Sequence, residues 1–209
     1  MLEMSIRWRM VKGKANQKQE SKLGRSDWIR LGLTVLAESG VGAVRVEPLA
    51  KRMKMTKGSF YWHFKNRQDL LDALLDEWVE IDTNGIIEQV NQLEADPKTK
   101  LMRLFELAIA EHDQLPGIAD GSIEKSIRAW ATSEPKVAEV IAKVDQKRLN
   151  YTQSIFLDIG FSDDEAWVRA RLVYYALVGE LTIGGASNQM NRLEEMRMQH
   201  RILTSGISA

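Results

Sequence analysis

Apolar residues recur at intervals of three and four along most of the chain, and this spacing constrains the fold more than any other feature. Leu71, Leu74, Trp78 and Ile81 show it in one long segment. Residues three and four apart share one face of an α-helix, so each such segment predicts a helix with one buried side. No segment has the strict alternation that is typical of a half-buried strand. The sequence therefore predicts an all-α protein.

Start and stop signals divide this pattern into about nine helices. Ser162–Glu165 reads Ser-Asp-Asp-Glu, a capping box, and Asp96-Pro97 places a capping carboxylate before a proline at the first helical position. We expect three short helices within residues 23–66, and then a long helix that begins near Arg67 and runs to about Glu94. Residues 67–209 are predicted to form a larger helical domain, and residues 1–22 a flexible basic arm.

The three short helices are followed by a change in charge. Residues 1–68 hold fifteen Lys and Arg against five Asp and Glu, whereas residues 69–209 hold fourteen against twenty-four. A tight break at Lys54–Thr56 precedes the third short helix, which is the helix-turn-helix arrangement. A basic helix-turn-helix head on an acidic body indicates that the head alone meets a polyanion.

The third helix lies in the segment MTKGSFYWHFKN, residues 55–66. Phe60 and Phe64 are four apart and can face the first two helices, which leaves the remaining rings outside. Rings with polar tips, set between lysines, suit contact with DNA phosphates. The alternative is that these rings pack against the body and the lysines are only solvated. The side chains that we expect to face DNA are Lys57, Tyr61, Trp62, His63, Lys65 and, from the next helix, Arg67.

Two stretches, AESG at residues 37–40 and VEPLAKRMKMTKGSFYWHFKNRQDLL at residues 46–71, resemble the DNA-binding head of the tetracycline-repressor (TetR) family of bacterial transcription regulators. The resemblance covers Asp27 to Trp78, about a quarter of the chain. It implies phosphate contacts from Arg45, Tyr61, His63 and Arg67, base or phosphate contacts from Lys57, Gly58 and Ser59, and base or sugar contact from Trp62. Thr56, which caps the third helix, belongs to the same DNA-facing set. The family usually has glycine where this chain has Lys54, so we expect a strained turn there.

The body is expected to sense a ligand and to dimerise. In TetR-like proteins the helices after the head enclose an effector pocket, and pairing of the last two helices makes a homodimer. Aromatic residues at helical spacing can equally form a plain core. The candidate pocket residues are Trp78, Phe105, Ile109, Trp130, Tyr151 and Phe156. An apolar stripe near the C-terminus supplies the candidate dimer contacts Trp167, Ala170, Val173, Tyr174, Leu177 and Leu181.

Several classes of function lack support in the sequence. The chain has no cysteine, and its three histidines do not form metal-ligand spacings. It has neither a phosphate-binding glycine loop nor a G-x-S-x-G motif, and no apolar run long enough to span a membrane. We therefore expect a cytoplasmic protein without enzymatic activity, cofactor or metal. The expected function is a repressor that a small-molecule effector releases from its double-stranded operator. The alternative is an all-α interaction protein whose basic head binds another polyanion.

Overall fold

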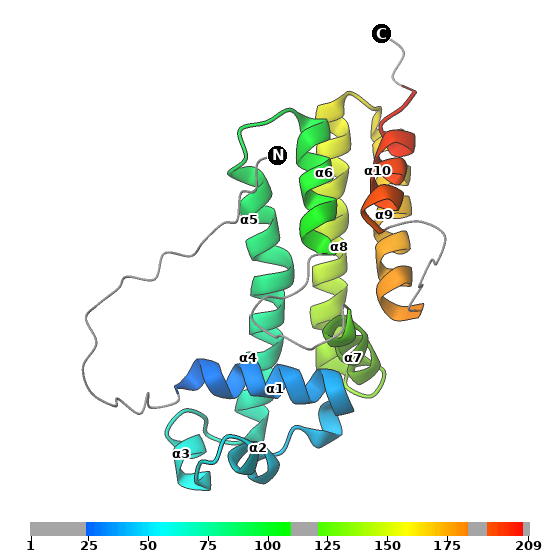
Figure 1. The fold of residues 1–209 in the computed structure, drawn as a ribbon. Helices are drawn as coiled ribbons and strands as arrows, with labels where there is room; N and C mark the ends of the chain where they lie inside the picture. Colours follow the sequence, from blue (N-terminus) through cyan, green and yellow to red (C-terminus); the bar gives the residue numbers. More distant parts are fainter. Residues whose placement is uncertain (1–23, 110–120, 184–191, 207–209) are drawn as a thin grey trace, which may run out of the picture.

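The computed structural model describes residues 24–109, 121–183 and 192–206. The predicted arm at residues 1–22 lies outside these ranges. Every regular element in the described ranges is helical, which confirms the all-α prediction. Figure 1 shows the three N-terminal helices at one end of the molecule and the remaining helices running from there toward the other end.

The head consists of α1 (Arg25–Ser39), a 3₁₀ turn at Val41–Ala43, α2 (Val46–Arg52) and α3 (Lys57–Tyr61). Asp27 opens α1 by accepting a hydrogen bond from the Gly24 backbone N–H at 2.8 Å. Gly32 lets α1 cross α4 closely, because a Cβ at this position would lie 2.8 Å from the Leu74 side chain. Figure 1 shows α1 lying across the end of the longer helices, with α2 and α3 on its far side.

One long helical run connects the head to the body. It comprises α4 (Arg67–Val79), a π-helical segment (Glu80–Gly85) and α5 (Ile86–Asn91). The sequence predicts this run to about Glu94, a few residues beyond its observed end, and does not predict the wider π turn. A π turn brings backbone five residues apart together, and a Cβ at Gly85 would lie 3.1 Å from the Glu80 carbonyl oxygen. Such turns occur mainly as local insertions in α-helices, often at functional sites.

The body consists of α6 (Pro97–Ala108), α7 (Ser122–Ala131), α8 (Pro135–Ile159), α9 (Asp163–Ile183) and α10 (Arg192–Leu203). Two predicted helix starts are confirmed. The Asp96 carboxylate accepts from the N–H groups of Lys98 and Thr99 at 3.0 and 3.2 Å. Ser162 and Glu165 form a reciprocal capping box, since each side chain accepts a bond from the other residue's backbone N–H.

Two separate apolar cores support these helices. The first joins the head to α4, α7 and the first half of α8, and contains Trp28, Trp78 and Trp130. The second joins α5, α6, the end of α8, α9 and α10, and contains Phe105 and Phe156. Buried polar residues on α8, on α7 and in the π segment lie at the level where the first core ends and the second begins. This polar layer borders the cavity described below.

Candidate nucleic-acid interface and ligand cavity

Helix α3 is held in place by two rings and a cap. Phe60 and Phe64 are fully buried, as predicted, and stack with their centroids 5.3 Å apart. The Phe60 ring also meets Trp28 of α1 edge to face, with centroids 5.3 Å apart. Thr56 accepts a hydrogen bond from the Ser59 N–H at 3.3 Å and so caps the helix. A helix of five residues is too short to persist alone in water, so these contacts fix its position.

The opposite side of α3 presents aromatic side chains to solvent. Tyr61 is 58% exposed and Trp62 is 87% exposed, the two values being among the highest of any large apolar side chain in the described ranges. His63 lies beside them and is half-buried, while Lys57, Gly58 and Lys65 are exposed. The alternative in which these rings pack against the body is therefore excluded for Tyr61 and Trp62. The exposed Trp62 and Tyr61 rings lie next to each other, and together they leave an aromatic surface open to a partner.

Gly58 has no internal steric reason to be glycine. A Cβ there would meet Thr56 Oγ1 at 3.6 Å, an ordinary contact, and the residue is exposed. Glycine in a helix costs roughly 0.5–1 kcal/mol relative to alanine. An external surface that approaches the backbone of α3 closely would explain this residue.

Lys57 is oriented by an ion pair. Its ammonium lies 2.6 Å from the Glu47 carboxylate, and both side chains are more than half exposed. The hydrogen bond from Lys57 lowers the pKa of Glu47. Because the pair is exposed, solvent and salt screen it strongly. A phosphate can therefore replace Glu47 as the partner of Lys57 at small cost.

The two arginines of the head differ in their contacts. Arg45 is exposed and donates from Nε to the Gly42 carbonyl at 2.9 Å, which leaves its outer nitrogens open to solvent. Arg67 donates from Nε to Val44 O at 2.6 Å and from Nη2 to Val41 O at 2.7 Å. These bonds tie the start of α4 to the turn before α2, and the phosphate contact of Arg67 stays a prediction. The backbone at Lys54 has φ +56°, so the predicted left-handed turn residue is confirmed.

The body encloses a cavity with about 110 Å³ of space that the centre of a water molecule can reach. Its walls come from the π segment, α5, α6, α7, α8 and α9, and they are mainly aliphatic. A smaller cavity of about 50 Å³ lies behind a shared wall that includes Phe105, Val173 and Leu177. Concave sites with apolar walls and a few convergent polar groups are typical of small-molecule binding sites.

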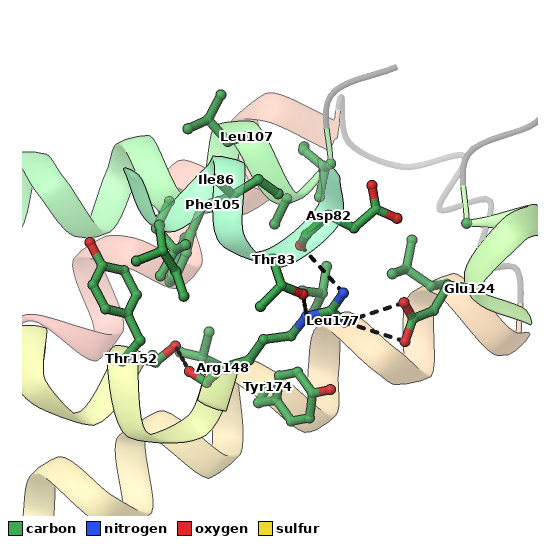
Figure 2. A pocket seen from close by; sticks show the side chains of 18 of the residues that line it. Asp82, Thr83, Ile86, Phe105, Leu107, Glu124, Arg148, Thr152, Tyr174 and Leu177 are labelled. Carbon is green, nitrogen blue, oxygen red and sulfur yellow. Dashed lines mark hydrogen bonds and ion pairs between the residues drawn. The ribbon is translucent and has the colours of Figure 1, made fainter. Parts of the chain in front are cut away.

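A charged cluster forms the polar part of this cavity (Figure 2). The buried Glu124 carboxylate pairs with Arg128 at 2.7 Å and with Arg148 at 3.2 Å. Arg128 also pairs with Asp145 at 2.8 Å, and the Tyr174 hydroxyl donates to the same carboxylate at 2.6 Å. Burial, helped by Asp145, raises the pKa of Tyr174 to about 12. Burial alone would lower the pKa of Arg128, but Asp145 and Glu124 outweigh it and the pKa is raised.

Arg148 links the cavity to the helix that leaves the head. Its Nε donates to Thr83 Oγ1 at 2.9 Å and its Nη2 to the Asp82 carbonyl at 3.3 Å, both in the π segment (Figure 2). Its guanidinium lies 5.3 Å from the centroid of Trp78, which belongs to α4. In the described part of the chain, the buried Trp78 Nε1 has no hydrogen-bond partner. Any molecule that displaces Arg148 therefore changes the contacts of α4 directly.

The structure divides the predicted pocket residues into two groups. Phe105, Ile109 and Tyr151 line the cavity. Trp78, Trp130 and Phe156 are buried in the two cores instead and are absent from its lining. Sequence reasoning missed Thr83, Glu124 and Arg148. Arg148 carries a signal in retrospect, because it follows the buried Val144 and precedes the buried Thr152 at four-residue steps, on the apolar face of its helix.

The predicted dimer stripe on α9 faces into the protomer. Ala170 and Tyr174 are buried, and Val173, Leu177 and Leu181 line the cavity with Tyr174. Trp167 is half-buried, and Arg171 stacks on its ring. A different apolar stripe on α9 and α10 is exposed: Val168, Leu172, Tyr175, Leu193, Met198 and Ile202. Helical spacing located an apolar face on α9, but a buried face inside a protomer and one between protomers have the same pattern.

Within residues 24–109, 121–183 and 192–206, no group of three His, Asp or Glu side chains could hold a metal ion. None of the helices in those ranges is both long and apolar enough to cross a membrane.

The head is a helix-turn-helix domain with a basic, aromatic outer surface, and it is joined to a helical body. This combination is typical of a DNA-binding regulator. Residues 29–74 match the family described as bacterial regulatory proteins, tetR family. The tetracycline repressor protein class G of Vibrio anguillarum is 41% identical over 54 residues, which is 26% of this chain and 26% of that protein. The regulator TtgR of Pseudomonas putida is 29% identical over 88 residues, 42% of each chain. The chain thus spans about a quarter to two-fifths of these relatives' length.

Solved structures extend the likeness to the body. The fatty acid degradation regulator FadR from Bacillus halodurans superposes with a TM-score of 0.66 at 19% identity, over 91% of this chain and 98% of that one. FadR from Bacillus subtilis, in complex with stearoyl-CoA, gives a TM-score of 0.60 at 20% identity, over 87% of this chain and 98% of that one. At this identity the likeness concerns the fold. The head of the chain therefore matches the TetR family, as its sequence predicted, and the chain as a whole shares the fold of the solved regulators.

Proposed function

We propose that the chain is a cytoplasmic, non-enzymatic transcription repressor that binds operator DNA through α2 and α3 as a homodimer, and that a small molecule in the body cavity releases it. In this proposal residues 23–66 form the DNA-binding unit and residues 67–209 the sensing and dimerising unit. The observation that carries it is the outer face of α3, where Trp62 and Tyr61 stand in solvent between Lys57 and Lys65 while Phe60 and Phe64 anchor the helix.

The head offers groups for both kinds of DNA contact. Lys57 and Lys65 are exposed and, with Arg45 just before α2, supply positive charge for phosphates. Gly58 allows a DNA strand to approach the backbone closely. The outward Tyr61 hydroxyl and Trp62 ring are placed for phosphate and for base or sugar contact. His63, Ser59 and the capping Thr56 lie on or beside the same surface. Because Arg67 is tied to backbone carbonyls, it acts here by holding the start of α4.

Dimerisation uses the exposed stripe of α9 and α10 in this proposal. Val168, Leu172 and Tyr175 follow one another at steps of four and three and so share a face. Ile202 and Met198 extend the apolar surface on α10. Figure 1 shows both helices on the side of the body away from α5. Burial of this stripe against a second copy would set two heads at a fixed separation, as paired half-sites require.

Effector control follows from the contacts of Arg148. A ligand that takes Arg148 away from Thr83 or Trp78 changes the packing of the run that begins at α4, next to the head. A conformation with another spacing between the two heads binds the operator less tightly. The effector lowers DNA affinity only if it prefers that second conformation.

The experiment that tests this function measures DNA binding by the full chain. A duplex selected from a random library is labelled, and its affinity is compared with that of an unrelated duplex at 50 and 200 mM salt. We expect a steep loss with salt for both duplexes and a specificity ratio of roughly a thousandfold or more. Salt-dependent binding without sequence preference, or equal binding to heparin, would favour the alternative of an interaction protein with a polyanion-binding head.

A further inference from the structure

The cavity has one polar corner on otherwise apolar walls. The apolar walls include Ile86, Phe105, Leu107 and Leu177. The side chains of Thr83, from the π segment, and Arg148, from α8, line the polar corner (Figure 2). A ligand that fills this space must therefore be mainly apolar and carry its polar group at one position.

The charges that are joined by ion pairs at this corner balance one another. Arg128 and Arg148 carry two positive charges, and Glu124 and Asp145 carry two negative ones, all joined by the ion pairs given above. The carboxylate of Asp82 also borders the cavity, but it already has contacts of its own, and its negative charge helps to raise the pKa of Arg148. A buried charge is stable only when it gains an opposite partner. A ligand carboxylate or ammonium would have to disrupt these pairs to gain one.

Thr83 supplies the hydrogen-bond donor for a neutral ligand. Its side chain is 1% exposed, it lines the cavity, and its oxygen accepts from Arg148 Nε. Among the described residues, none accepts a hydrogen bond from the Thr83 hydroxyl. A hydroxyl has one donor to satisfy, and a buried polar group without a partner is costly. An oxygen acceptor on the ligand would satisfy it.

The volume sets the size of the ligand. A water-sized group needs about 10–15 Å³ of this kind of space, so 110 Å³ holds roughly seven to eleven non-hydrogen atoms. A linear molecule of eight carbons with one polar group falls in that range. The stearoyl-CoA recorded with the Bacillus subtilis FadR structure is far larger.

We propose that the cavity binds an uncharged, mainly apolar molecule of roughly seven to eleven non-hydrogen atoms with one hydrogen-bond-accepting oxygen, the chemistry of a medium-chain ketone. Thr83 donates to that oxygen, and the aliphatic walls contact the chain. The binding of this molecule to the cavity does not require DNA. The inference therefore rests on the proposed function only where it names the molecule as the effector.

The test uses four molecules of matched length with the full chain: 2-octanone, octanoate, octylammonium and octane. Calorimetry at pH 7 gives each affinity, and quenching of tryptophan fluorescence gives a second readout. We expect 2-octanone to bind roughly three- to tenfold more tightly than octane, as one neutral hydrogen bond provides. Octanoate and octylammonium should bind at least tenfold more weakly than the ketone. Equal or tighter binding of either ion, of octane or of stearoyl-CoA would overturn the proposal.

Two matched substitutions test the role of Thr83. Thr83→Val keeps the shape but removes the hydroxyl, so it should abolish the preference for 2-octanone over octane. Thr83→Ser keeps the hydroxyl and should retain the preference. Loss of the preference in both variants, or in neither, contradicts the assignment. Circular dichroism establishes that each variant is folded, and if Thr83→Val unfolds, the four-ligand comparison on the unaltered chain decides.

A final measurement separates this inference from the proposed function. The selected duplex is titrated with the chain in the presence of saturating 2-octanone. Ketone binding with unchanged DNA affinity would support the ligand class and contradict effector-controlled release. DNA binding without measurable ketone affinity would support the regulator and overturn the ligand class.

Discussion

Replacing Glu124 by glutamine removes the carboxylate that joins two arginines while nearly keeping the side-chain volume. The Glu124 side chain is 4% exposed, and it pairs with Arg128 at 2.7 Å and with Arg148 at 3.2 Å. The amide oxygen of glutamine can still accept a hydrogen bond, but the cluster gains one uncompensated positive charge. The substitution therefore isolates the charge from the packing.

The expected loss is large. Breaking a buried ion pair by removing one partner costs about 3–5 kcal/mol. Arg128 keeps Asp145 as a partner, so the lower end, about 3 kcal/mol, applies here. For a chain of this size, 1 kcal/mol corresponds to roughly 2–4 °C in melting temperature. We expect Glu124→Gln to lower the melting temperature by roughly 6–12 °C in calorimetry at pH 7.

Glu106→Gln is the matched control. Glu106 pairs with Arg103 at 3.2 Å, but both side chains are more than one third exposed, so the change should cost less than about 1 kcal/mol. Similar losses in the two variants would refute the assigned role of burial. Glu124→Gln should also shift ligand preference toward octanoate, since the cavity then carries excess positive charge. Continued rejection of octanoate by the folded variant would contradict the charge-balance argument.

Four further predictions concern other parts of the molecule. Leu172→Glu should convert the proposed homodimer to a monomer in sedimentation at micromolar concentration, whereas Glu139→Gln, at an exposed position of α8, should not. A wild-type monomer would remove the dimer proposal. Tyr61→Ala should weaken selected and unrelated DNA by a similar factor, because a phosphate contact carries no sequence information; a loss confined to the selected duplex would contradict that contact. Lys54→Gly should raise the free energy of unfolding by up to about 1 kcal/mol, because glycine relieves the backbone strain at φ +56°, whereas Lys54→Ala keeps that strain and should not. Equal effects of the two substitutions would show that loss of the lysine charge, and not relief of strain, changes the stability. The pKa of Tyr174 is raised to about 12, so this residue keeps its proton in the folded state at a pH where the unfolded chain loses it; its contribution to the free energy of unfolding should therefore fall between pH 10 and 12 by about 1.4 kcal/mol per pH unit. Urea titrations of Tyr174→Phe should show a shallower fall with pH, and identical slopes would refute the raised pKa.

Local signals in the sequence located the head accurately, because the reasons for its structure are local. Thr56, Phe60 and Phe64 follow one another at steps of four residues, and their capping and burial follow from local helix geometry. The left-handed turn at Lys54 follows from the resemblance to a family with glycine at that position. Arg67 was assigned to DNA from its place at the start of the fourth helix and from the resemblance. Its bonds to the carbonyls of Val41 and Val44 could not be predicted, because they join residues more than twenty positions apart.

The cavity depended on contacts that a single sequence does not display. Glu124 and Arg148 lie on different helices, and nothing in either helix alone indicates that they meet. Aromatic residues were chosen for the pocket by size, but Trp78 and Trp130 are better buried in a core than placed beside a space. The stripe on α9 was identified as apolar, and its partner could be determined only once α7 and α8 were seen to cover it.

If α3 binds an operator as proposed, its brevity has a consequence for how the operator preference can change. Its position is fixed from beneath by Trp28 and Phe60, whereas Lys57 and Trp62 face solvent. New residues at the outer positions can alter which bases are favoured without loosening the domain. Conversely, a change at Trp28 would behave in vivo like a loss of target recognition, although this side chain lies out of reach of any nucleic acid.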